Sequence, residues 1–165
     1  MKAIKVKLNS GIAQLNTEIR GRRQSFTGAW NLIIEDDQER TFSIQCLVPG
    51  SPDSLSGLSG AMGDWSKNDY AIELSAYDEK GDDFSVNEET AKELKSVLQQ
   101  MESGEIKPVN VYGGEVSSDY VMKVVEFIKP KLEYVPRNIE GGTIATRMDI
   151  ETSMSQNDLP PTSRA

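Results

Sequence analysis

The chain has 165 residues, one cysteine and no histidine. This length is that of one ordinary domain, and the lack of histidine excludes the most common general base, zinc ligand and nucleophile partner of enzymes. The formal net charge of −8 is uneven, because residues 1–27 carry a net of +5 and residues 28–165 a net of −13.

The first predicted elements are two strands. Residues 3–8 alternate between the apolar side chains of Ile4, Val6 and Leu8 and two lysines, which is the period of a half-buried strand. Residues 12–20 alternate in the same way after the turn signal "NSG". The two segments are therefore expected to pair as a hairpin.

A second hairpin is expected from "AWNLIIE" and "RTFSIQCLV", which flank the polar turn "DDQE". Alternate residues of each strand are apolar, so one face of this hairpin should lie in the core. The residues predicted to face inward are Trp30, Leu32, Ile34, Phe42, Ile44, Cys46 and Val48.

Residues 49–69 are rich in proline, glycine and serine and predict a long loop. Loops of this length in a small domain often bind something, and Met62 and Trp65 are large apolar side chains suited to anchor a partner. The glycine-rich run in the loop is not followed by a lysine or a helix signal, so a phosphate-binding loop is not expected. A short hairpin should follow from "YAIELSAYD" and "FSV".

Two helices are expected next. The first begins near Ser85 or Asn87, carries an apolar stripe of Leu94, Val97, Leu98 and Met101, and ends at Gly104. The second begins at Ser117 or Ser118 and ends at Pro130, with apolar positions that indicate a core helix. The short strand "KPVNVY" should lie between them, and a last strand "KLEYV" should follow.

These elements predict an α+β fold in which an antiparallel sheet of hairpins precedes a helix–strand–helix segment packed on the sheet. Residues 1–136 are expected to form this single domain. Residues 137–165 contain few large apolar side chains and no sustained period, which predicts a polar C-terminal tail that becomes ordered only against a partner.

The segment "IRGRRQSFTG" is the most basic part of the chain and allows three interpretations. It is a solvated hairpin loop, or a contact surface in which Arg20, Arg22 and Arg23 grip carboxylates or phosphates beside Phe26, or a modification site at Ser25. We expect Arg20, Arg22, Arg23 and Phe26, together with the two apolar residues of the long loop, to bind a partner.

The sequence contains no pattern that indicates an active site. Cys46 shares a strand face with apolar residues, so we expect a buried core residue and not a nucleophile. No serine lies in a nucleophile elbow, and the acidic turns lack calcium-loop spacing. No catalytic residue, metal or cofactor is therefore predicted, and the chain is expected not to be an enzyme.

Localisation and function follow from these expectations. The single cysteine, the lack of a signal-like first segment and the lack of a long apolar run predict a cytoplasmic protein outside membranes. The leading hypothesis is a non-enzymatic interaction protein, a structural or accessory subunit of a larger assembly that binds itself or another protein, such as a phage or mobile-element component. The alternatives are an acidic inhibitor or adaptor of a basic nucleic-acid-handling protein, and, less favoured, a nucleic-acid binder that uses the basic hairpin.

Overall fold

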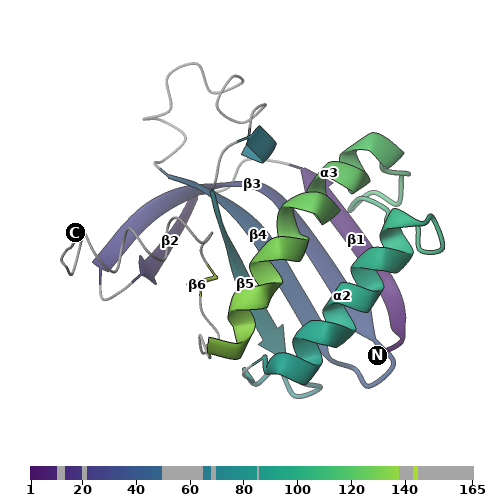
Figure 1. Ribbon diagram of the computed structural model, residues 1–165, viewed down its shortest axis with the longest axis horizontal. Coiled ribbons are helices and arrows are strands. Elements are labelled where there is room, and N and C mark those ends of the chain that lie inside the picture. The colour runs from purple at the N-terminus through teal and green to yellow at the C-terminus, as the bar shows by residue number, and fades with distance from the viewer. Residues whose placement is uncertain are drawn as a thin grey trace.

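The computed structural model describes residues 1–10, 14–19, 22–49, 65–67, 70–84, 86–137 and 143–144. In this part of the chain an antiparallel sheet is covered on one face by two helices, which confirms the predicted α+β class (Figure 1). The strands lie in the order β1-β3-β4-β5-β6, and β2 also pairs with β3. Their bounds are β1 (Ala3–Ser10), β2 (Gln14–Ile19), β3 (Arg22–Asp36), β4 (Thr41–Pro49), β5 (Ala71–Tyr77) and β6 (Thr143–Ile144).

The predicted first hairpin is wrong, because β1 and β2 do not pair with each other. Both run antiparallel to β3, with Val6 opposite Ile34 and Gln14 opposite Thr27. β4 pairs along the opposite edge of β3, so β1 and β2 follow one another along a single edge of this 15-residue strand. One long edge satisfies the backbone groups of both segments, and the chain reverses between Ile19 and Arg22 instead of at "NSG".

The inward residues predicted for β3 and β4 are all buried, and they form one core with the helices. A register shift lies between Gly28 and Asn31 of β3, where Cys46 of β4 faces two residues instead of one. Such a bulge bends a strand and increases its twist. Ile4 differs from the prediction because it is 66% exposed; the pairing of β1 with β3 shifts between Ala3 and Lys5, which breaks the alternation there.

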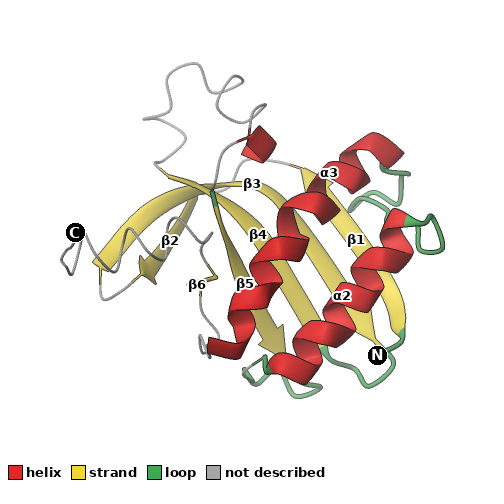
Figure 2. Cartoon of the chain, in the orientation of Figure 1, coloured by secondary structure: helices red, strands yellow, loops and turns green. Residues whose placement is uncertain are grey.

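The two helices α2 (Glu88–Glu102) and α3 (Ser118–Ile128) lie side by side on the same face of the sheet (Figure 2). Each helix begins where the sequence predicts. The Asn87 side chain accepts a hydrogen bond from the backbone N–H of Thr90 at 2.8 Å, and the Ser117 side chain accepts one from the backbone N–H of Tyr120 at the start of α3. Gly104 follows α2 with φ +86°, in the left-handed region that favours glycine. The predicted apolar stripes face the core, and the residues that carry them are Leu94, Val97, Leu98, Met101, Val121, Val124, Val125 and Ile128.

Three short segments differ from the predicted strands. The segment between the helices pairs only at Val109, which bridges Lys7 at the free edge of β1. Near the predicted return strand "FSV", the bridge to β5 lies one residue earlier, between Asp83 and Tyr77, and the Phe84 N–H donates to the carbonyl of Ala76. The predicted strand "KLEYV" is wrong, because residues 129–137 form the 3-10 helix η3 (Lys129–Arg137) directly after α3. Helical spacing places Lys131 and Leu132 in the core here, and the Lys131 amine donates to the carbonyl of Phe127.

Two further findings concern the end of the chain and membranes. Thr143 and Ile144, which belong to the predicted tail, pair with β5 as the short strand β6. Among the described residues, the structure contains no helix that is both long and apolar enough to cross a membrane.

Candidate interaction surface

The basic segment expected to be a loop is largely strand. Arg22, Arg23 and Phe26 belong to β3, and the structure describes their backbone, with Arg22 opposite Ile19 and Arg23 opposite Glu18 of β2. Arg20 and Met62 lie outside the described residues. The contact role of these five residues stays a prediction.

Trp65, the other expected anchor, lies in the core. It belongs to the single 3-10 turn η2 (Trp65–Lys67), and its side chain is only 5% exposed. Its ring packs edge-on against Phe127, Trp30 and Tyr120, with centroid separations of 5.3, 5.6 and 6.1 Å. Aromatic pairs prefer this geometry, so the ring stabilises the fold and is not presented to a partner in this structure.

Cys46 also lies in this part of the core, as the sequence predicts. It is fully buried, and burial raises the pKa of its thiol to about 12, although the charge of Lys131 acts in the opposite direction. Burial likewise raises the pKa of the Tyr120 phenol to about 12, with a smaller contribution from Cys46. Neither group forms the anion that nucleophilic or base catalysis at neutral pH needs.

Asp36, a buried acid at the turn between β3 and β4, makes several hydrogen bonds. Its carboxylate accepts hydrogen bonds from the backbone N–H groups of Gln38 and Arg40, both at 2.9 Å, and from Nε of Arg40 at 2.7 Å. Burial raises the pKa of Asp36, but the hydrogen bonds and charge of Arg40 and the N–H of Gln38 outweigh it, so the pKa lies below its usual value. The carboxylate closes this turn and has no role that points to catalysis.

The described part of the chain also bears on metal binding. Within the described ranges, no three histidine, cysteine, aspartate or glutamate side chains lie close enough to hold a metal ion together.

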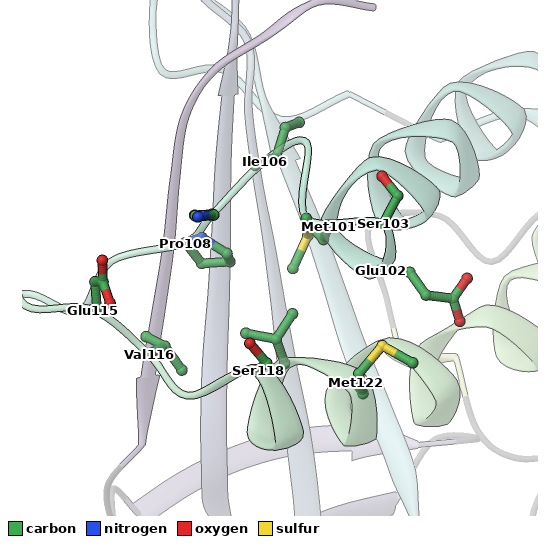
Figure 3. A pocket seen from close by; sticks show the side chains of 12 residues that line it. Met101, Glu102, Ser103, Ile106, Pro108, Glu115, Val116, Ser118 and Met122 are labelled. Carbon is green, nitrogen blue, oxygen red and sulfur yellow. The ribbon is translucent and has the colours of Figure 1, made fainter.

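Among the described residues, a concave feature lies between the C-terminal end of α2 and the N-terminal end of α3, and we call it the α2–α3 groove (Figure 3). It has a volume of about 260 Å³. Met101 and Pro108 lie across the groove from Val116 and Met122, as Figure 3 shows. Charged side chains also line the groove, namely Glu102, Lys107 and Glu115.

A tight turn leads from one wall of the groove. The Asn110 side-chain oxygen accepts hydrogen bonds from the backbone N–H groups of Tyr112 at 2.9 Å and Gly114 at 3.0 Å. Gly113 adopts φ +83°, which the turn requires and which favours glycine. The turn presents Val111 and Tyr112 to solvent, at 60% and 93% exposure. A large apolar pair is thus held rigidly on the surface.

Neither the turn nor the groove was predicted from the sequence. "NVYGG" combines asparagine with two glycines, which is a turn signal, but the alternation before it favoured a strand. The groove has no comparable signal, since its lining residues span positions 101–122 and meet only when the two helices pack.

The turn and the α2–α3 groove are therefore the candidate interaction surface of the described residues. Comparison of this chain with protein-family models, with curated proteins and with solved structures found no match.

Proposed function

We propose that this chain is a non-enzymatic protein-interaction protein, a subunit or accessory factor of a larger assembly. The observation that carries the proposal is the turn around Tyr112, where a tyrosine that is 93% exposed sits on a backbone fixed by the Asn110 side chain. Tyrosine is enriched among the residues that dominate binding energy at interfaces, and a rigid turn loses little entropy when it binds.

The surroundings of the thiol, phenol and carboxylate groups, which act as catalysts in many enzymes, support the same proposal. The only thiol is fully buried, and the pKa values of Cys46 and Tyr120 lie near 12. Three of the carboxylate contacts of Asp36 are used to hold a turn. A single unpaired thiol also fits a reducing compartment such as the cytoplasm.

The test is the mass of the purified full chain in solution, measured by sedimentation velocity from low micromolar to near-millimolar concentration. We expect a species heavier than the 18.2 kDa monomer, or a second protein that co-purifies in a fixed ratio. Tyr112→Ala should weaken that association, whereas Glu79→Ala, at an exposed turn elsewhere, should not. A monomer at every concentration, with no co-purifying protein, would refute the proposal.

A further inference from the structure

We draw no further inference here: the strongest candidate, the α2–α3 groove between the C-terminal end of α2 and the N-terminal end of α3, carries none because its charged side chains are two carboxylates and one ammonium group, one of the carboxylates is paired with Lys129, and nothing in the structure shows what covers it.

Discussion

Replacing Trp65 by alanine should destabilise the protein strongly, because this ring is a core residue and not a surface anchor. The side chain is 5% exposed and touches three other aromatic rings at centroid separations of 5.3 to 6.1 Å. A buried tryptophan removes about 200 Å² from water, which at about 25 cal/mol per Å² corresponds to about 5 kcal/mol. The alanine retains part of that burial, so truncation should cost about 3–5 kcal/mol.

The assay is urea denaturation of the full chain followed by far-ultraviolet circular dichroism. Total stabilities are commonly about 5–15 kcal/mol, so Trp65→Ala could leave too little folded protein to measure. Trp65→Phe retains a ring and should show a smaller loss with the same denaturant slope. The matched control is Tyr112→Ala, which truncates a ring that is 93% exposed and should change stability by no more than about 0.5 kcal/mol.

The reverse result would refute the reasoning. If Trp65→Ala lost less than about 1 kcal/mol while association fell sharply, the ring would not belong to the core in solution and would act as the partner anchor that its sequence context suggests.

Two further predictions concern titratable groups. Cys46 should react slowly with a thiol reagent at pH 8 and rapidly only after denaturation, because it is buried with a pKa of about 12. Rapid labelling of the native protein would contradict this burial. Cys46→Ala should lower the free energy of unfolding by roughly 1 kcal/mol. The lowered pKa of Asp36 should make stability depend on pH in acid. The folded-state pKa lies below the unfolded value of about 3.9, so the stabilisation is complete above that value and is lost as the pH falls through the folded-state pKa. Asp36→Asn should flatten this acid limb in melting experiments, and an unchanged pH profile would show that the contacts with Arg40 do not hold in solution.

The features that the sequence predicts correctly are those decided within a few residues. The apolar positions of β3, β4, α2 and α3 repeat at the strand or helix period, and these residues are buried as expected. Asn87 and Ser117 accept backbone hydrogen bonds from residues three positions later, so the starts of both helices were predictable. The burial of Cys46 follows from the same alternation.

The features that the sequence did not predict depend on contacts between residues that are far apart in the chain. Alternation shows that residues 12–20 form a strand but not which strand they pair with, and the length of β3 allowed both β1 and β2 to pair along one edge. Trp65 lies in a polar segment that suggests exposure, yet its ring meets Trp30 and Phe127, which are 35 and 62 residues away in the sequence.

The candidate site divides in the same way. The sequence by itself determined the uneven charge, the basic segment and the lack of histidine, because these are properties of composition and order. Only the tertiary structure decided that residues between positions 101 and 122 close around a groove and that Tyr112 is exposed on the turn that leads from it. The physical reason is that a concave surface requires two helices to pack at a particular distance and angle, and the contacts that fix this packing come from the whole core.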